Sequence, residues 1–561
     1  MSFNLISKNF YKFLLVSLFI LFGVLGVAKI SWAADFYITQ NVSGANTGAN
    51  CANAHSAAWF NTADNWANPK QTGKIGPGDT VHLCGTFTFP ANDSTNGLLK
   101  ARGSGSAGSP ITILFEPNAK LQSPQFSQNG GLMLHYYWGC HGYIIVDGGT
   151  NGVIENTANG TGLAYHAASR GLFITGYYTW SLSHVEVKNL TIRNIYVNGG
   201  SNPNATDTDG QSTENIYLSG NLDNISIHDC TFSNARTGVN GPFDGVTWTN
   251  VDIYNNYIND HCWGMSIAGL SAPSTATNLT IHNNEITDWA NWQCPASASF
   301  CTNKTDTYHT DGIITYSGDS APVYAPLIYN NYIHGDLGSG SPTALTYCTV
   351  GNPTGNGRSG SECIIFNNLL VNTGSGAHTA LWFGTQTKNN KVYNNTIVGT
   401  VTNSSFNPCI ISSSLGGDVY KNNICSTFSQ IFSTQWSGNR APETFISAMD
   451  NNVYYNIGTA SISSDVGHNH TLAQWQGLGY DTHSVTTDPL LDSSYKPTVG
   501  SSAINAGADL SSVGITALNS DKAEVTRPQG SAWDIGAYEY AEAAPPPDTT
   551  PPGPPTNVTV Q

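Results

Sequence analysis

The sequence predicts an all-β chain wound into a parallel β-helix, a solenoid in which each turn adds short strands to the turn before it. A six-residue pattern recurs eight times, as in "IYNNYI" and "IHNNEI". The apolar runs are short and rich in β-branched residues, whereas helical repeats would show a 3.6-residue period over longer segments. Only 10% of the residues are charged. Such a chain buries its core by stacking similar turns.

The repeat sets the length of one turn. Its copies start at Ile192, Ile227, Ile253, Ile281, Ile328, Ile365, Val392 and Val419. The closest starts lie 26 to 28 residues apart, and intervals of 35, 37 and 47 residues indicate loops inserted into some turns. The fifth residue after each start is apolar: Val197, Phe232, Ile258, Ile286, Ile333, Leu370, Ile397 and Ile424. We expect both positions to form a continuous core, with turns about 4.8 Å apart.

Asparagine recurs at a fixed place in the repeat. The third residue after the start is Asn in six consecutive copies: Asn256, Asn284, Asn331, Asn368, Asn395 and Asn422. Amides at equivalent positions of stacked strands hydrogen-bond from turn to turn. We therefore predict a structural Asn ladder at a bend of the coil.

Residues 1–33 are typical of a secretory signal. Lys8 and Lys12 precede an apolar run from Phe13 to Ala28, and "SWA" predicts cleavage after Ala33. An uncleaved anchor is the weaker alternative, because the sixteen apolar residues are fewer than the roughly 20 that cross a bilayer. We expect a secreted or cell-surface protein with no stable membrane span after cleavage.

The rest of the chain divides into four parts by composition. These are an N-terminal cap with the first turns (34–130), the β-helix (131–485), a closing segment (486–540) and a Pro-rich linker (541–561). A solenoid needs capped ends, and we expect the caps in the first part and in the closing segment. The final "PPTNVTV" resembles the first strand of a fibronectin type III or similar sandwich module. Two expectations stay open, further C-terminal modules or a simple tail.

The charge of the chain excludes one class of partner. Signal cleavage removes three Lys and no acidic residue, which leaves 18 basic and 37 acidic residues. A chain this acidic is not expected to bind nucleic acid. The acidity also weighs against a strongly basic groove for acidic polysaccharides, unless a cation such as Ca²⁺ supplies positive charge.

Eleven cysteines predict disulfides in an exported protein. Pairing of neighbours suggests Cys51–Cys84, Cys230–Cys262, Cys294–Cys301, Cys348–Cys363 and Cys409–Cys425. Cys140 is then left unpaired. No Cys and His spacing suggests a zinc site.

Both ends of the solenoid resemble a known superfamily. The opening "DFYITQNVSG" with "GPGDTVHLCGTFTF" and the closing "SSAINAGADLSSVG" through "RPQGSAWDIGAYEY" resemble the ends of secreted bacterial proteins of the right-handed parallel β-helix (pectate-lyase-like) superfamily. The resemblance covers about residues 35 to 540. It implies a right-handed coil and leaves the reaction open.

A row of polar residues precedes the strands that follow the Asn bend. Arg236, His261, His309 and His378 lie two or three residues before "GVNGP", "GMSIAG", "GIITYS" and "ALWFGT". If these strands stack, the row spans nearly 20 Å, enough for several sugar rings. The residues predicted for substrate binding are Trp263, Trp289, Trp292, Tyr347, His378 and Trp382. Aromatic faces over a groove suit sugar binding.

The residue types favour a polysaccharide lyase that eliminates at uronic acid residues. Arg236 is expected to pair with the uronate, His261 or His309 to remove the carbon-bound proton, and Tyr308 to act as the acid. Asp260 and Asp311 are candidates to hold a Ca²⁺ ion that bridges to the uronate. An epimerase would use nearly the same groups.

Two other functions stay open. A glycoside hydrolase needs two carboxyl groups, for which Asp260 and Asp311 are candidates. "HTDG" resembles the "NTDG" motif of polygalacturonases, yet "GDD", "GHG" and "RIK" are absent from this sequence. A non-catalytic surface or adhesion protein that binds glycans is the alternative from another class, since Asp-Gly pairs such as Asp311–Gly312 also mark simple turns.

Overall fold

The fold is described by a computed structural model of the 561-residue chain. It describes residues 33–158, 167–177, 179–195, 213–242, 245–269, 275–289, 310–317, 325–335, 344–350, 362–373, 379–384, 387–400, 407–434, 441–458, 460–463 and 469–541. The predicted signal, residues 1–33, and linker, residues 541–561, lie almost wholly outside these ranges. Among the described residues no helix has the length and apolar character of a membrane span.

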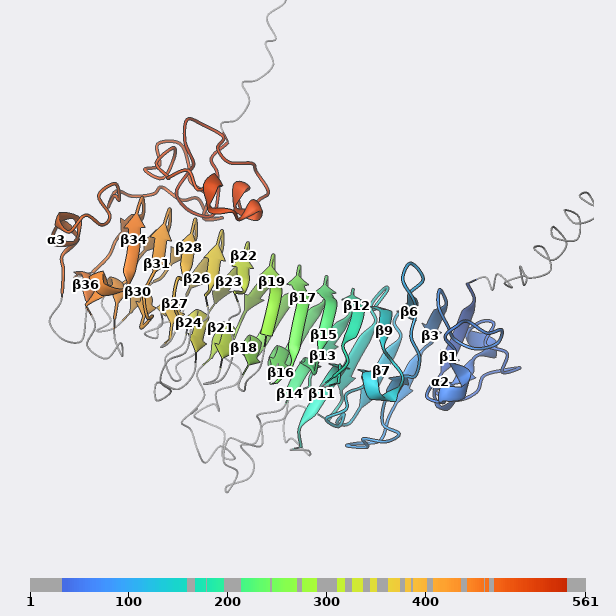
Figure 1. Ribbon diagram of the computed structural model, residues 1–561. Coiled ribbons are helices and arrows are strands. Elements are labelled where there is room, and N and C mark those ends of the chain that lie inside the picture. The colour runs from blue at the N-terminus through green and yellow to red at the C-terminus, as the bar shows by residue number, and fades with distance from the viewer. Residues whose placement is uncertain are drawn as a thin grey trace, which may run out of the picture.

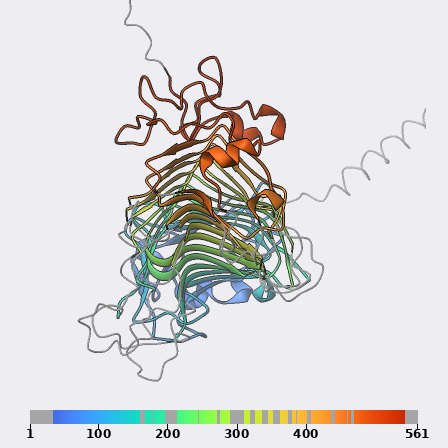
Figure 2. The same cartoon turned by 90° about the vertical axis from the view of Figure 1, so that its left-hand side faces the viewer.

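The chain forms a right-handed parallel β-helix, which confirms the predicted fold class. Each turn contributes strands to three faces, and all pairings between the named strands are parallel (Figures 1 and 2). Face 1 is a sheet of 14 strands among the described residues. In order, they are β2 (His55–Ser56), β1 (Asp35–Thr39), β3 (Thr80–Leu83), β6 (Ile111–Phe115), β9 (Gly142–Asp147), β12 (Leu182–Lys188), β15 (Leu222–His228), β17 (Thr247–Tyr254), β19 (Thr275–His282), β22 (Leu327–Tyr329), β25 (Ile364–Phe366), β28 (Lys391–Tyr393), β31 (Asp418–Lys421) and β34 (Ile446–Asp450).

Faces 2 and 3 are joined into one sheet by two long strands, β16 (Thr231–Pro242) and β18 (Tyr257–Gly269), which bend from one face to the other. Face 2 also contains β4 (Thr86–Thr88), β7 (Lys120–Ser123), β10 (Val153–Asn156), β13 (Thr191–Arg193), β20 (Glu285–Thr287), β23 (Tyr332–Gly335), β26 (Leu369–Asn372), β29 (Thr396–Val398), β32 (Ile424–Ser426) and β35 (Val453–Tyr455). Face 3 also contains β5 (Leu99–Ala101), β8 (Leu132–His135), β11 (Ser169–Thr175), β14 (Thr213–Ser219), β21 (Asp311–Ser317), β24 (Ala344–Val350), β27 (Thr379–Phe383), β30 (Pro408–Ser412), β33 (Gln430–Ser433) and β36 (Ala460–Ser463).

Helices lie at the ends and in the connections. They are η1 (Cys51–Asn53), α2 (Ala57–Phe60), η2 (Ala63–Asn65), η3 (Tyr136–Trp138), η7 (Pro442–Thr444), α3 (Leu472–Gly477), η8 (Ser511–Val513) and η9 (Thr516–Asn519). Phe60 of α2 and Trp475 of α3 are fully buried against the core. In Figure 1 these helices lie at opposite ends of the stack. They therefore cap the coil.

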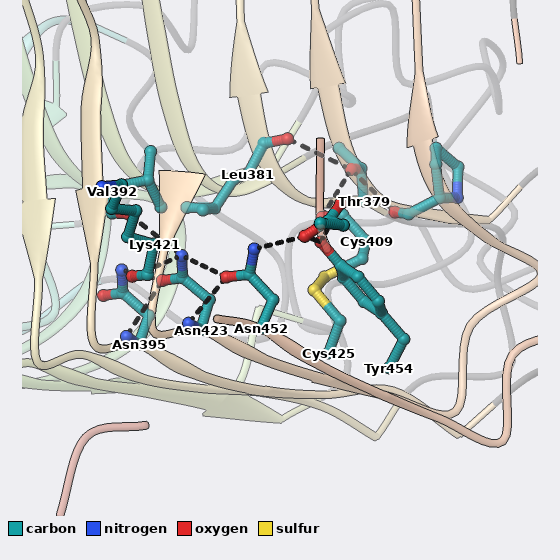
Figure 3. The surroundings of a disulfide bond; sticks show 12 residues. Thr379, Leu381, Val392, Asn395, Cys409, Lys421, Asn423, Cys425, Asn452 and Tyr454 are labelled. Atoms are coloured by element: carbon teal, nitrogen blue, oxygen red, sulfur yellow. Dashed lines mark hydrogen bonds between the residues drawn. A yellow bond between two sulfur atoms is a disulfide. The ribbon is translucent and has the colours of Figure 1, made fainter. Parts of the chain in front are cut away.

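The Asn ladder is present between faces 1 and 2. Asn256, Asn284, Asn331, Asn368, Asn395, Asn423 and Asn452 form one continuous column. Each Oδ1 accepts from the backbone N–H and the side-chain amide of the preceding Asn; for Asn284 and Asn331 these distances are 3.0 and 3.1 Å. Figure 3 shows the end of this column beside the Cys409–Cys425 disulfide. The ladder satisfies buried polar groups of the bend.

The prediction placed the first copy of the repeat five residues too late and the last copy one residue too early. Val187 pairs with the anchor Ile227, whereas Ile192 lies on β13 and pairs with Phe232. Val392 pairs with Tyr420 rather than Val419, so Asn423 replaces Asn422 in the ladder. Val419 and Ile424 face outward and are apolar because the closing segment covers them. Sequence spacing alone did not separate this covered surface from the core.

The first Asn of each "NN" pair has a different role. Asn255, Asn283, Asn330, Asn367 and Asn394 have φ between 51° and 55°, a left-handed conformation that Asn tolerates better than most residues. Several of these side chains also hold the closing segment. Asn394 donates to the Asp534 carbonyl at 2.9 Å, and Asn422 donates to the Ala508 carbonyl at 2.8 Å.

The closing segment does not cap the end of the coil, contrary to the prediction. Leu510, Leu518 and Trp533 pack on the outward side chains of Phe366 and Tyr393. Figures 1 and 2 show the segment, in red, folded back along the side of the stack. α3 covers the end instead, because Trp475 fills the last core layer.

Three predicted disulfides are confirmed and one is wrong. The bonds are Cys51–Cys84, Cys348–Cys363 and Cys409–Cys425. Cys230 is a buried free thiol, because it lies at the ladder bend whereas Cys262 lies further along the next turn. Cys140 is also free and buried, as predicted, and burial raises its pKa to about 12. Cys294 and Cys301 lie outside the described residues.

Face 3 has glycines at the positions where the backbone of the next turn approaches most closely. They are Gly171, Gly238, Gly264 and Gly312. A Cβ on Gly264 would lie 2.6 Å from both the Gly312 carbonyl oxygen and Ile286 Cγ2. The glycine preserves this close contact while the preceding residue, Trp263, faces outward.

Replacing Asn331 by Ala should destabilise the protein. The change removes the acceptor for two Asn284 N–H groups and the donor to the Ile281 carbonyl. Because these groups are buried, we expect a loss of about 3 kcal/mol in the free energy of unfolding. Denaturant titration measures it. The exposed Thr277→Ala on neighbouring β19 is the control, expected to change stability by less than about 0.5 kcal/mol. Equal effects would contradict the role of the ladder.

Gly264→Ala should destabilise through overpacking. The new methyl group would clash with the Gly312 carbonyl and Ile286, at a cost of about 2 kcal/mol. Gly477→Ala is the matched control, because no neighbouring atom lies within 4 Å of its added Cβ. Thermal unfolding of both variants tests this, and an unchanged midpoint for Gly264→Ala would refute it.

Candidate functional site

Face 3 brings polar and aromatic side chains from successive turns into register. One column of paired residues runs Arg170, Glu214, Thr237, Trp263 and Asp311. A second, three residues further along each strand, runs Phe173, Tyr217, Asn240, Ser266, Ile314, Tyr347 and Trp382. The glycine after each first-column residue from Thr237 to Asp311 keeps these backbones close.

A buried carboxyl group occupies the middle of this surface. Glu214 is 1% exposed. It accepts from Arg170 Nε and from Asn240 Nδ2, both at 3.1 Å. Burial raises the pKa of Glu214, and the charges of Arg170 and Arg236 oppose that rise. The carboxyl is therefore held between two cations rather than solvated.

The two arginines also stack on aromatic rings. The Arg170 guanidinium carbon lies 3.4 Å from the Tyr217 ring centre, and that of Arg236 lies 4.4 Å from the Trp263 ring centre. Such contacts fix the orientation of a guanidinium group. The predicted pair Arg236 and Trp263 is thus brought together.

His261 does not join Arg236 in a groove. Ala235, not Arg236, pairs with His261. Arg236 and His261 are therefore one residue out of register in the sheet. The imidazole is 1% exposed. Its Nε2 donates to Asn215 Oδ1 at 2.6 Å, and burial lowers its pKa to about 3. His261 is a neutral interior side chain, and the expectation that it faces an open groove is wrong.

Asp311 and Trp289 also lie inside. The Asp311 carboxylate is fully buried and accepts from the Ala344 N–H at 3.1 Å. Trp289 belongs to the core and donates from Nε1 to the Asp311 carbonyl at 3.0 Å. The prediction that Trp289 overhangs a groove is wrong, because it instead fills the space beside β21.

Of the other predicted site residues, three lie on described strands and four lie outside the described residues. Trp382 is half-buried on β27, and Tyr347 precedes it in the same column. Asp260 lies on β18 at a φ of 58°. Tyr308, His309, Trp292 and His378 lie outside the described residues, and their roles stay predictions.

The described residues do not form a complete set of carboxylate ligands for the predicted Ca²⁺ ion. Within the described ranges, no cluster of three or more His, Cys, Asp or Glu side chains could hold a metal ion. A Ca²⁺ ion takes six to eight oxygen ligands. The Asp311 carboxylate is buried and accepts from the Ala344 N–H, and its role toward Ca²⁺ stays a prediction.

Sequence reasoning missed the groups that cluster most tightly. Arg170 and Glu214 are 44 residues apart in the chain, and neither belongs to the recurring six-residue pattern. It also missed two aromatic clusters, "HYYW" from His135 and "YYTW" from Tyr177. Their density of aromatic residues was a signal, although nothing local showed that they meet.

The sequence matches no protein-family model and no curated protein. Solved structures similar to it include a GH136 lacto-N-biosidase from Eubacterium ramulus (12% identity, 78% of this chain, 68% of that chain, TM-score 0.41). They also include the pectate lyase Pel9A (14% identity, 91% of this chain, 97% of that chain, TM-score 0.38). A third is XylC in complex with xylose (10% identity, 90% of this chain, 99% of that chain, TM-score 0.44). The likeness concerns the fold alone.

The burial of His261 predicts a pH dependence of stability. Its pKa is about 3 in the folded state against 6.5 when exposed, so the unfolded chain binds the proton between these values. Stability is fully present above pH 6.5 and falls as the pH drops, by about 2 kcal/mol between pH 7 and pH 5. His261→Gln should remove this part of the slope. Denaturant titrations at both pH values compare the two proteins, and parallel slopes would contradict the assignment.

Proposed function

We propose that the protein binds an extracellular polysaccharide along face 3 and cleaves it by elimination at uronic acid residues. One observation carries this proposal. In a chain with a net charge of −16, four cations gather with aromatic rings on face 3: Lys100, Arg102, Arg170 and Arg236. Cations attract the uronate, and ring faces suit its sugar ring.

Lys100, which is 6% exposed and donates to the Thr95 carbonyl, and Arg102 add positive charge beside this face. They lie 4.6 and 5.0 Å from the Trp138 ring centre. Burial and the charge of Arg102 lower the pKa of Lys100, with Asp93 opposing. Within the described part of the chain neither takes part in an ion pair.

Elimination requires a cation on the uronate and a base for the carbon-bound proton. Arg236 lies next to Trp263 and is assigned the first role. With His261 buried, the base is assigned to His309 and the acid to Tyr308. Ca²⁺ is retained only as a supplement to be tested.

A non-catalytic glycan-binding protein is the second candidate. The buried, neutral state of His261 favours it, because the predicted row then loses the one base that lies among the described residues. The same cations and rings would serve binding alone. Extracellular location is proposed for either function, because disulfides persist in oxidising surroundings.

The experiment is a panel of polysaccharides incubated with the full-length secreted protein. Polygalacturonate and alginate supply uronates, and xylan and arabinan serve as neutral polymers, each with Ca²⁺ and with chelator. We expect unsaturated products, detected by ultraviolet absorbance, from a uronate polymer only. Reducing ends without unsaturation would indicate hydrolysis, and binding without products would indicate the second candidate.

Variants then test the residues. His309→Ala should abolish the unsaturated product, and Arg236→Gln should lower kcat/KM by about 10-fold to 100-fold, the range for a lost charged hydrogen bond. Arg193→Gln, a half-exposed arginine on face 2, is the control. Unchanged turnover by His309→Ala would refute the assigned base.

A further inference from the structure

Two neighbouring turns carry aromatic loops at the N-terminal end of face 3. After β8 the chain forms η3, which contains Tyr136, Tyr137 and Trp138. After β11, Tyr177 and Trp180 form an antiparallel backbone bridge. The following turn has only Gly220 and Asn221 between β14 and β15. A short link beside two longer loops leaves a notch in the surface.

The notch has a volume of about 560 Å³. Its walls combine aromatic rings with hydroxyl groups and backbone: His135, Tyr137, Trp138, Tyr177, Tyr217 and Ser219 are the main contributors. Among the described residues, no Asp, Glu, Lys or Arg lines it. Lys100 and Arg102 contact the Trp138 ring without forming part of the wall.

The aromatic rings at this notch are unusually exposed. Tyr137 is 73% exposed, Trp180 60% and Tyr177 41%. The Tyr137 and Tyr177 rings lie 5.9 Å apart and form one lip. Large exposed rings gathered in one place commonly mark a binding surface.

The backbone holds these rings in place. Tyr177 and Trp180 exchange two backbone hydrogen bonds, at 2.9 and 3.2 Å. His135 Nδ1 accepts from the Tyr137 N–H at 3.1 Å. That bond leaves the proton of the neutral imidazole on Nε2, where it is a hydrogen-bond donor. A preorganised site binds with less loss of conformational entropy.

We infer that this notch is a subsite for an uncharged sugar residue of the bound polysaccharide. A sugar ring has apolar C–H faces, which match the tyrosine rings, and hydroxyl groups, which match Ser219 and His135. The described wall residues offer no cation to an anionic ring and no carboxylate to a cationic ligand. The inference rests on the proposed function in that both sites bind one chain.

The position of the notch specifies the substrate further. Tyr217 on β14 lies two turns before Ser266, which is three residues beyond Trp263 on β18. Tyr217 and Trp263 are therefore offset by about 10 Å along the coil axis and about 10 Å along the strand. A chain that places a uronate at Arg236 would place a nearby residue in the notch. The geometry therefore selects a heteropolysaccharide that combines uronic acid and neutral sugars.

Binding of neutral tetrasaccharides to the full-length protein tests this. Xylotetraose, cellotetraose, mannotetraose and galactotetraose are titrated by calorimetry against the wild type and three variants. The double variant Tyr137→Ala with Tyr177→Ala should weaken binding about 10-fold or more, as expected when two ring contacts are lost. The Phe double variant should retain most of the affinity, and the control Arg193→Gln on face 2 all of it. Thermal unfolding checks that each variant is folded.

The outcomes separate this inference from the proposed function. Loss of neutral-sugar binding in the Ala variant, with or without uronate cleavage by the wild type, supports the notch. Failure of every tetrasaccharide to bind the wild type overturns it. So does equal affinity of the Ala variant and the wild type, even if the protein cleaves a uronate polymer.

Discussion

The column of asparagines at the bend between faces 1 and 2 is the interaction on which the rest of the structure depends. Parallel strands satisfy their own backbone groups, but a tight bend leaves N–H and carbonyl groups buried. Each ladder Asn satisfies such groups from a neighbouring turn. The preceding Asn supplies the left-handed backbone, and in later turns its amide holds the closing segment. The Asn-Asn dipeptide thus shapes the bend, supplies hydrogen bonds to its buried backbone groups and holds the closing segment.

Face 3 lies away from the Asn column, and the candidate functional groups lie on it. The glycines at its strand entries permit close backbone approach, so the preceding side chains are displayed in a column. Glu214 occupies a buried place between Arg170 and Asn240. Burial of such a charge is expensive unless it is paired. The arginines therefore stabilise this buried carboxyl group.

Much of the fold was predictable, because its core repeats with a fixed period. Ile281 and Ile328 are fully buried as expected, and neighbouring Cys residues close three of the predicted bonds. The candidate site was less predictable. Arg236 and His261 precede their strands by similar distances in sequence, yet they differ by one place in register. A shift of one residue exchanges the inner and outer sides of a strand. Consequently one side chain stacks on Trp263 and the other lies inside.

The sequence by itself determined the period of the coil, its apolar positions and its Asn bend, because each is written into consecutive residues of every turn. The tertiary structure decided which polar groups are buried, as for His261 and Asp311. It also decided which distant segments meet, as for Tyr137 and Tyr177 or Arg170 and Glu214. Those contacts depend on register and on the length of the intervening loops, which local composition does not encode.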